Sequence, residues 1–211
     1  MFSFLLDIIF PKFCCGCDHL GTFLCPKCFK QIEFFKHPVE IEAELQYCDQ
    51  LWAMAKYQKP IDKLIFDLKY QSVKSIALVC AKMLFYQTRI PRVDVITFVP
   101  LHPKKQFQRG FNQAQIIAQE YGKLTKIPVV EFLIKTKNNQ AQASLDQKND
   151  RLKNIVGVYR PINHLPIDAE KILRCLIIDD VSTTGATINE CAKVLKEMGI
   201  QKVYGLTVAH G

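Results

Sequence analysis

Two adjacent acidic residues, followed by small and hydroxylated residues, form the chemically clearest segment of this sequence. Asp179 and Asp180 come directly after an apolar run, and residues 182–187 read Ser-Thr-Thr-Gly-Ala-Thr. Carboxylates at the end of a buried strand cost free energy unless something binds them. Neighbouring carboxylates suit vicinal hydroxyl groups, and closely spaced N–H groups at the start of a helix suit a phosphate. The segment therefore predicts a sugar-phosphate site.

The small loop has its own conformational requirement. Gly185 permits a backbone shape or a close approach that a side chain would obstruct. An ordinary acidic turn with a threonine cap before a helix remains the alternative interpretation. The sequence has no G-x-x-x-x-G-K-[ST] run, so an ATPase of the Walker type is disfavoured.

Cysteines near the N-terminus form a second chemical pattern. Cys14 and Cys17 make one C-x-x-C pair, and Cys25 and Cys28 make another seven residues later. Two such pairs complete a tetrahedral shell around one cation, so we predict a structural Zn²⁺ site with these four ligands. Cys15 is a possible substitute ligand, and a redox pair or an iron–sulfur cluster is the alternative chemistry.

The other cysteines and the first residues bear on the compartment. Cys175 lies in an apolar run and Cys191 in a helical pattern, as expected for buried thiols in a reducing compartment. The first ten residues lack a basic n-region and are interrupted by Asp7, so a short amphipathic helix is expected there and not a signal peptide. No segment reaches the length of a membrane span. We expect a cytoplasmic protein.

The chemical residues must be positioned by alternating strands and helices. Strand-like patterns cover residues 51–57, 93–101, 129–134, 175–180 and 203–209. Helical patterns cover residues 61–70, 72–87 (with a serine cap), 112–124 and 187–198 (closed by Gly199). Such alternation predicts a mainly parallel sheet flanked by helices, with ligands beyond the carboxyl ends of the strands. Residues 100–102 and the two acids should meet at that edge.

Composition is consistent with one substantial core and one small module. The chain has 211 residues, of which 49% are apolar and 23% charged, and its net charge is +8. We expect an N-terminal helix and a four-cysteine module in residues 1–45, and an α/β domain in residues 46–211. The basic excess makes an anionic partner plausible, either nucleic acid or a phosphorylated small molecule.

Two motifs resemble known families. Residues 176–187 resemble the phosphoribosyl-diphosphate motif of type I phosphoribosyltransferases. Residues 100–114 and 142–159 resemble the ComF family of competence-associated, phosphoribosyltransferase-like proteins. The matching pattern comprises Arg109, Phe111, Asn112, Gln113, Gln142, Leu145, Arg151 and Asn154. Together with the cysteine segment, the resemblance covers essentially the whole chain.

The resemblance implies a phosphoribosyltransferase-like α/β fold that binds 5-phosphoribosyl 1-diphosphate with Mg²⁺. By resemblance, Asp179 and Asp180 contact the ribose hydroxyls, and they and Arg109 are the candidate catalytic residues. The implied substrate-binding residues also include Val181, Ser182, Thr183, Thr184, Gly185, Ala186 and Thr187 around the 5′-phosphate, and Leu101, His102, Lys104 and Lys105 near the diphosphate. In related enzymes, a peptide bond in the segment that corresponds to residues 101–105 can be strained or cis.

Residues 135–154 correspond by position to a mobile flap that closes over the diphosphate in related enzymes. Closure would bring Lys137 or Arg151 toward the leaving group. A linker without a role is the alternative. The resemblance also implies natural transformation as the setting, with single-stranded DNA and the uptake machinery, such as helicases or DNA-processing proteins, as partners. A non-catalytic DNA-binding or adaptor protein that uses the site as a sensor is the competing hypothesis.

Overall fold

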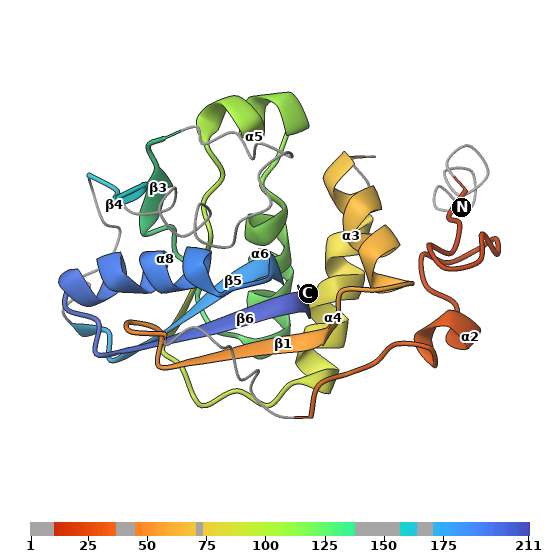
Figure 1. The fold of residues 1–211 in the computed structure, drawn as a ribbon, viewed down its shortest axis with the longest axis horizontal. Coiled ribbons are helices and arrows are strands. Elements are labelled where there is room, and N and C mark those ends of the chain that lie inside the picture. The colour runs from red at the N-terminus through yellow and green to blue at the C-terminus, as the bar shows by residue number, and fades with distance from the viewer. Residues whose placement is uncertain (1–10, 37–44, 71–73, 138–156, 164–170) are drawn as a thin grey trace.

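The computed structural model describes residues 11–36, 45–70, 74–137, 157–163 and 171–211. Its helices are α2 (Pro26–Phe29), α3 (Ile61–Tyr70), α4 (Ser75–Gln87), α5 (Pro103–Arg109), α6 (Gln113–Thr125) and α8 (Ala186–Glu197). Its strands are β1 (Gln50–Lys56), β2 (Val95–Phe98), β3 (Leu133–Lys135), β4 (Tyr159–Pro161), β5 (Arg174–Ser182) and β6 (Lys202–His210) (Figure 1). The helix expected at the N-terminus and most of loop 135–154, including Arg151, lie outside the described residues.

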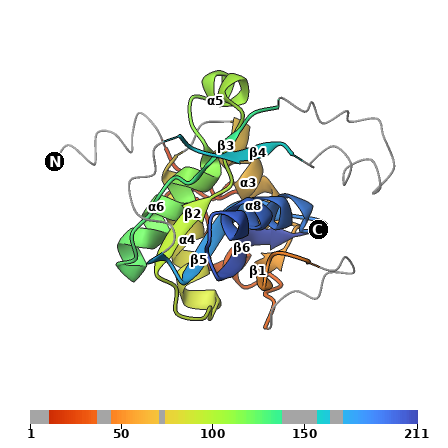
Figure 2. The same ribbon diagram turned by 90° about the vertical axis from the view of Figure 1, so that its left-hand side faces the viewer.

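The central sheet has the strand order β1-β6-β5-β2, and each neighbouring pair is parallel. Figure 2 shows α4 and α6 on one side of this sheet and α8 on the other. A parallel strand that is covered on both faces has no solvent side, which explains why the predicted strands read as nearly continuous apolar runs. The predicted fold class, a parallel sheet flanked by helices, is confirmed.

Alternate residues of β5 pack into two different hydrophobic cores. Leu176 and Ile178 belong to the core formed with α3, α4 and α6. Cys175 and Ile177 belong to the core formed with α8. This alternation follows from the two-residue period of a strand, and it fixes the face on which each later residue of β5 lies.

The segment predicted as one strand over residues 129–134 divides between two sheets. Val129 forms an isolated parallel bridge to Ile96 of β2, and Val130 N–H donates to the Ile96 carbonyl at 2.9 Å. The chain then leaves the central sheet, and β3 pairs antiparallel with β4. The prediction was therefore right about extended backbone and wrong about a single strand, because a second pairing partner from residues 159–161 was not foreseen.

Two helix boundaries test the predicted signals. Helix α4 begins at Ser75, with Lys74 at its N-cap and no side-chain capping bond, and the predicted cap residue Ser72 lies outside the described residues. Gly199 follows α8 with φ +97°, a left-handed conformation in which glycine carries no steric penalty. The predicted glycine closure of this helix is confirmed.

The cysteine-containing segment is joined to the central sheet through residues 33–35. Phe34 forms an antiparallel bridge with Ala55 of β1. Phe35 N–H donates to the Met54 carbonyl at 2.9 Å, and Lys56 N–H donates to the Glu33 carbonyl at 3.0 Å. The segment thus lies along the side of β1 that does not face β6. Within the described residues, no helix combines the length and apolar character needed to cross a membrane.

Candidate functional site

The two segments predicted to meet at one edge of the sheet do so. Strand β2 pairs with β5, and Val99 N–H, just after β2, donates to the Ile178 carbonyl at 3.0 Å. Residues 100–102 therefore leave the sheet beside Asp179 and Asp180, at the carboxyl ends of both strands. This is the edge at which ligands of open α/β sheets bind.

The two acids do not lie side by side, although the predicted binding of vicinal hydroxyls assumed that they would. Asp179 continues the face of Cys175 and Ile177 toward α8, and Asp180 continues the opposite face toward α3 and α4. Both are buried, and Asp180 N–H donates to Asp179 Oδ1 at 2.8 Å. The predicted arrangement is wrong in this respect because consecutive strand residues point to opposite faces. One carboxylate reaches the edge from each side.

Asp180 has a cationic partner that no motif indicated. Lys69, near the end of α3, places Nζ 2.9 Å from Asp180 Oδ2. Burial alone would lower the pKa of Lys69, but the charge of Asp180 and its hydrogen bond outweigh burial and raise it. Lys69 is therefore protonated at neutral pH and neutralises the buried carboxylate in the ligand-free protein.

Asp179 lies among groups of the α8 face. Burial first, and then the charge of Asp180, raise the pKa of Asp179 to about 8, against the opposing influence of Lys69 and Lys135. Lys135, at the end of β3, has a lowered pKa because of burial and the nearby charge of Lys105. These shifts place two acids and several lysines within electrostatic reach of one another at this edge.

Asp179→Asn is expected to raise stability at pH 8 and to leave it unchanged near pH 4. Because the folded-state pKa of Asp179 is raised to about 8, the folded protein holds a proton that the unfolded chain has released above about pH 4. The wild-type free energy of unfolding therefore falls as pH rises through this window, and the asparagine removes that fall. Urea unfolding of both proteins at several pH values measures it. If the difference in free energy of unfolding between the two proteins stays constant with pH, the raised pKa of Asp179 is contradicted.

The loop that joins β5 to α8 is a tight turn. Gly185, at the N-cap of α8, has φ +72°, and its N–H donates to the buried Ser182 Oγ at 3.1 Å. Ala186 N–H donates to Thr184 Oγ1 at 3.4 Å. The helix begins at Ala186, one residue before the start of the predicted helical pattern of residues 187–198. Backbone N–H groups at the start of α8 thus lie next to the end of β5, a suitable arrangement for an anion.

Residues 103–109, for which no helix was predicted, form α5. α5 begins with Pro103, and the Nδ1 atom of His102 accepts a hydrogen bond from Lys104 N–H at 3.2 Å. Gly110, with φ +80°, ends the helix. Proline at the first position and glycine after the last are strong helix signals, and the sequence interpretation overlooked them. The only cis peptide bond in the described part of the chain is Lys59–Pro60. The peptide bonds of residues 101–105, one of which can be cis in related enzymes, are therefore trans in this chain.

Arg109 lies between α3 and α6. Its Nη1 donates to Gln113 Oε1, and its Cζ lies 5.5 Å from the centre of the Tyr70 ring. Asn112, which is buried, caps α6 by accepting from Ala114 N–H at 3.0 Å, and its Nδ2 donates to the Val99 carbonyl at 3.0 Å. The Arg-Gly-Phe-Asn-Gln run thereby fixes the start of α6 against the segment that follows β2.

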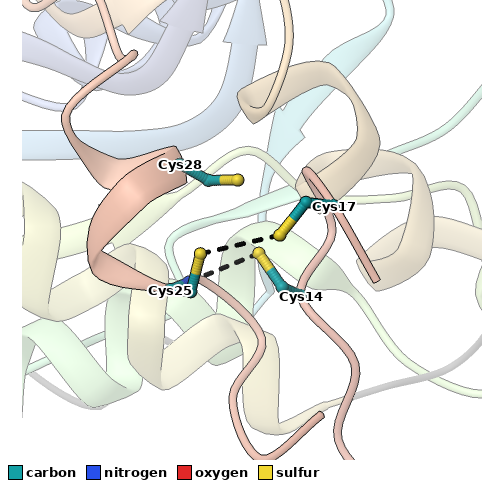
Figure 3. A group of neighbouring side chains, drawn as sticks. All are labelled: Cys14, Cys17, Cys25 and Cys28. Carbon is teal, nitrogen blue, oxygen red and sulfur yellow. Dashed lines mark hydrogen bonds between the residues drawn. The ribbon is translucent and has the colours of Figure 1, made fainter. Parts of the chain in front are cut away.

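The four predicted metal ligands come together in one cluster (Figure 3). The sulfur atoms of Cys14, Cys17, Cys25 and Cys28 all lie within 4.8 Å of one another. Cys25 N–H donates to Cys14 Sγ at 3.3 Å. Cys15 lies outside this cluster: its buried thiol hydrogen-bonds Asp67, and burial first and that bond second raise its pKa to about 12. The cluster could hold one metal ion without Cys15.

The thiols of the cluster suit a cation. Burial alone would raise the pKa of Cys14, but N–H groups of Cys25, Gly16 and Cys17 outweigh burial and lower it to about 6. Burial and neighbouring thiols raise the pKa of Cys28 to about 12. A bound cation favours the thiolate form of every ligand. Four thiol donors at these separations fit a tetrahedral metal site.

Comparison with known proteins establishes the relationship of the chain. No protein-family model matches it. Competence protein F of Haemophilus influenzae is 30% identical to this chain, in an alignment that covers 88% of this chain and 90% of that protein. This chain belongs to the ComF family.

Two further relatives accord with membership of the ComF family. DNA utilization protein YhgH of Escherichia coli is 28% identical, over 73% of this chain and 69% of that protein. Competence protein ComFC of Streptococcus pneumoniae is 26% identical, over 90% of this chain and 84% of that protein.

Solved structures similar to this ComF-family chain include phosphoribosyltransferases. One is glutamine phosphoribosylpyrophosphate amidotransferase from B. subtilis, with 20% identity and a TM-score of 0.43, over 64% of this chain and 26% of the enzyme. Another is adenine phosphoribosyltransferase from Thermoanaerobacter pseudethanolicus, with 13% identity and a TM-score of 0.40, over 72% of this chain and 85% of the enzyme. Likeness of this degree says nothing about individual site residues.

Two cations at the edge of the sheet were missed by sequence reasoning. Lys69 occurs in an amphipathic helix pattern, where a lysine normally lies in solvent, and no spacing links it to Asp180. Lys135 was counted as the first residue of the expected flap, whereas Lys137, two residues later, was selected. Lys137 is exposed, and Lys135 is half-buried among the site residues. No local sequence pattern of this ComF-family chain indicates that either lysine lies near the two acids.

Proposed function

We propose that this ComF-family protein binds 5-phosphoribosyl 1-diphosphate with Mg²⁺ and acts on or with single-stranded DNA during DNA uptake. One observation carries the proposal: two buried acids, Asp179 and Asp180, adjoin a tight anion-compatible turn at the start of α8, with Lys69, Lys105 and Lys135 nearby. A sugar with a phosphate at one end and a diphosphate at the other matches this arrangement, because the acids can bind the sugar, and the turn and the lysines can bind the anionic groups. The cytoplasmic location expected from the sequence is part of the proposal.

The proposed contacts follow the predicted residues. Asp179 and Asp180 hold the ribose hydroxyls, one from each face of β5, and residues 181–187 surround the 5′-phosphate. The diphosphate is bound by Leu101, His102, Lys104, Lys105 and Arg109, with Lys137 and Arg151 approaching from the flap. Mg²⁺ is held mainly through oxygens of the ligand and water, as is usual for this ion.

As an enzyme, the protein would transfer ribose 5-phosphate to an acceptor. The bond between C1 of the sugar and the diphosphate oxygen breaks, the diphosphate leaves with the bonding electrons, and an acceptor atom supplies the new bond to C1. Positive charge develops on the sugar ring, close to the carboxylate of Asp180, and negative charge develops on the leaving diphosphate, close to the cations. Catalysis then rests on positioning and charge stabilisation, and a dedicated base is not required.

Calorimetry and a turnover assay test the proposal. Calorimetry with 5-phosphoribosyl 1-diphosphate and Mg²⁺ should show binding, and ribose 5-phosphate should bind more weakly because it lacks the diphosphate. Labelled 5-phosphoribosyl 1-diphosphate then reports release of pyrophosphate in the presence of single-stranded DNA. Absence of heat with both ligands would refute the sugar-phosphate site.

A non-catalytic DNA-binding or adaptor protein is the second candidate. The observation that favours it is that relatives are named for competence and DNA utilization. On this hypothesis the sugar-phosphate site senses its ligand, so calorimetry shows binding but no pyrophosphate appears with any acceptor. In either case the partners would be DNA and the uptake machinery, such as helicases or DNA-processing proteins.

We also propose that the four-cysteine cluster binds Zn²⁺ and serves as a structural centre. All four positions of a tetrahedral ion would be filled by Cys14, Cys17, Cys25 and Cys28, which leaves no position open for a substrate. Residues 1–45 would then form the metal-dependent module, and residues 46–211 the phosphoribosyltransferase-like domain.

A further inference from the structure

The outward face of α3 carries two exposed aromatic side chains that contact each other with their rings tilted by 43°. Phe66 is 48% exposed and Tyr70 65% exposed, and their ring centres are 4.9 Å apart. They are four residues apart and therefore adjacent on the helix surface. The aliphatic residues of α3, by contrast, are buried in the core (Ile61, Leu64, Ile65 and Leu68). The apolar surface that α3 exposes is thus made of aromatic rings.

A cation lies over the ring of each of these two residues. Lys63 Nζ is 5.3 Å from the centre of the Phe66 ring, and Arg109 Cζ is 5.5 Å from the centre of the Tyr70 ring. We call Lys63, Phe66, Tyr70 and Arg109 the α3 row. Lys63 also pairs with Asp67, whereas the partner that the described residues give Arg109 is the amide of Gln113. Arg109 therefore retains its full charge toward a ligand.

Aromatic faces bordered by cations fit one kind of occupant. Unpaired bases stack on exposed rings regardless of sequence, and the phosphates between them meet the cations. A duplex hides its base faces, so it could use the cations but not the rings. A purely apolar partner would leave the cations unmatched. The net charge of +8 adds attraction for any nucleic acid strand.

We propose that the α3 row binds single-stranded nucleic acid by stacking bases on Phe66 and Tyr70. This inference rests on the proposed function for the identity of the strand as incoming DNA. Lys69, which pairs with Asp180, directly precedes Tyr70, and Arg109 belongs both to the row and to the predicted diphosphate site. A strand bound to the row would therefore lie next to the proposed sugar-phosphate site.

The test is fluorescence anisotropy of a labelled oligothymidylate of about 20 nucleotides, longer than the ~4–16 nucleotides that a single binding groove covers. The full-length, metal-loaded protein is compared with the Phe66→Ala/Tyr70→Ala variant. Binding to the variant should be weaker by roughly tenfold or more, since the loss of base–aromatic stacking costs about 1–3 kcal/mol per base, and ~1.4 kcal/mol is tenfold. Tyr70→Phe, which keeps the ring face, should bind as the wild type does.

A matched control lies elsewhere on the surface. Phe85 and Tyr86, near the end of α4, are 39% and 75% exposed, with ring centres 5.2 Å apart. Phe85→Ala/Tyr86→Ala removes the same two residue types and should leave DNA binding unchanged. Thermal unfolding of each variant verifies that the fold persists.

The outcomes separate this inference from the proposed function. Equal oligothymidylate binding by wild type and Phe66→Ala/Tyr70→Ala, or no binding by either, overturns the α3 row. Equal affinity for duplex and single strand, insensitive to the variant, overturns it as well, because charge alone would then explain binding. Calorimetry with 5-phosphoribosyl 1-diphosphate should give the same result for the wild type and this variant. If the sugar phosphate fails to bind but the variant loses DNA, the α3 row stands and the proposed function fails.

Discussion

Replacing Cys17 or Cys28 with serine is expected to abolish the proposed binding of Zn²⁺ and to unfold residues 11–36. This segment has almost no core of its own: Cys14, Cys25 and Cys28 form its buried cluster, with Leu24 packed against them. Its helix α2 has four residues, too short to be stable alone. Binding of a structural Zn²⁺ contributes an apparent free energy of about 10–16 kcal/mol, which in such a segment is folding free energy.

The measurement combines metal content and hydrogen exchange. Wild type should contain one zinc ion per chain and show protected amides within residues 11–36, and the Cys17→Ser and Cys28→Ser variants should lose both. Cys15→Ser is the matched control, since Cys15 lies between two ligands in the sequence but contacts Asp67. If Cys15→Ser loses zinc while Cys17→Ser retains it, the ligand assignment is wrong. Iron and labile sulfide in the purified protein would indicate a cluster instead of zinc.

Asp180→Asn is expected to weaken binding of 5-phosphoribosyl 1-diphosphate by about 10-fold to 150-fold, since hydrogen bonds to a charged group contribute roughly 1.5–3 kcal/mol. In the proposed site, the buried Asp180 carboxylate accepts a hydrogen bond from a ribose hydroxyl. The same change leaves Lys69 without its counter-ion, and breaking a buried ion pair costs about 3–5 kcal/mol, so stability should fall too. Both effects arise from one side chain.

Calorimetry and urea unfolding separate the two effects of Asp180→Asn. The double variant Lys69→Met/Asp180→Asn removes both members of the pair and should recover much of the lost stability without recovering ligand binding. Asp94→Asn is the control: Asp94 pairs with Arg174 before β2, at the opposite end of the strands, and its loss should not affect the ligand. Unchanged affinity in Asp180→Asn would remove Asp180 from the proposed ribose site.

The fold could be predicted because its signal is local. Strands β1 and β5 and helices α3 and α6 follow directly from the period of their apolar residues, and parallel pairing follows from their alternation. The cysteine cluster was equally accessible, since the ligand spacing is set by the chain itself. Helix α5 could have been predicted from Pro103 and Gly110, but these signals were overlooked.

The details of the site could not be predicted because they depend on contacts between distant segments. Lys69 meets Asp180 only because α3 packs on the face of the sheet to which Asp180 points. The separation of Asp179 and Asp180 onto two faces was available from the strand period, yet the apparent fit to vicinal hydroxyls obscured it. Lys135 belongs to the site because β3 leaves the central sheet to pair with β4, which no local pattern indicates.

The pairing of residues 33–35 with β1 would give the proposed metal centre a second role, in protecting one edge of the central sheet from other chains. β1 is one of the two outer strands of the central sheet, and its N–H and C=O groups on the side away from β6 would otherwise offer a template for another chain. If loss of zinc detaches this covering segment, the exposed strand invites intermolecular β-pairing. Chelator-treated protein should therefore aggregate in a concentration-dependent manner before its α/β domain melts.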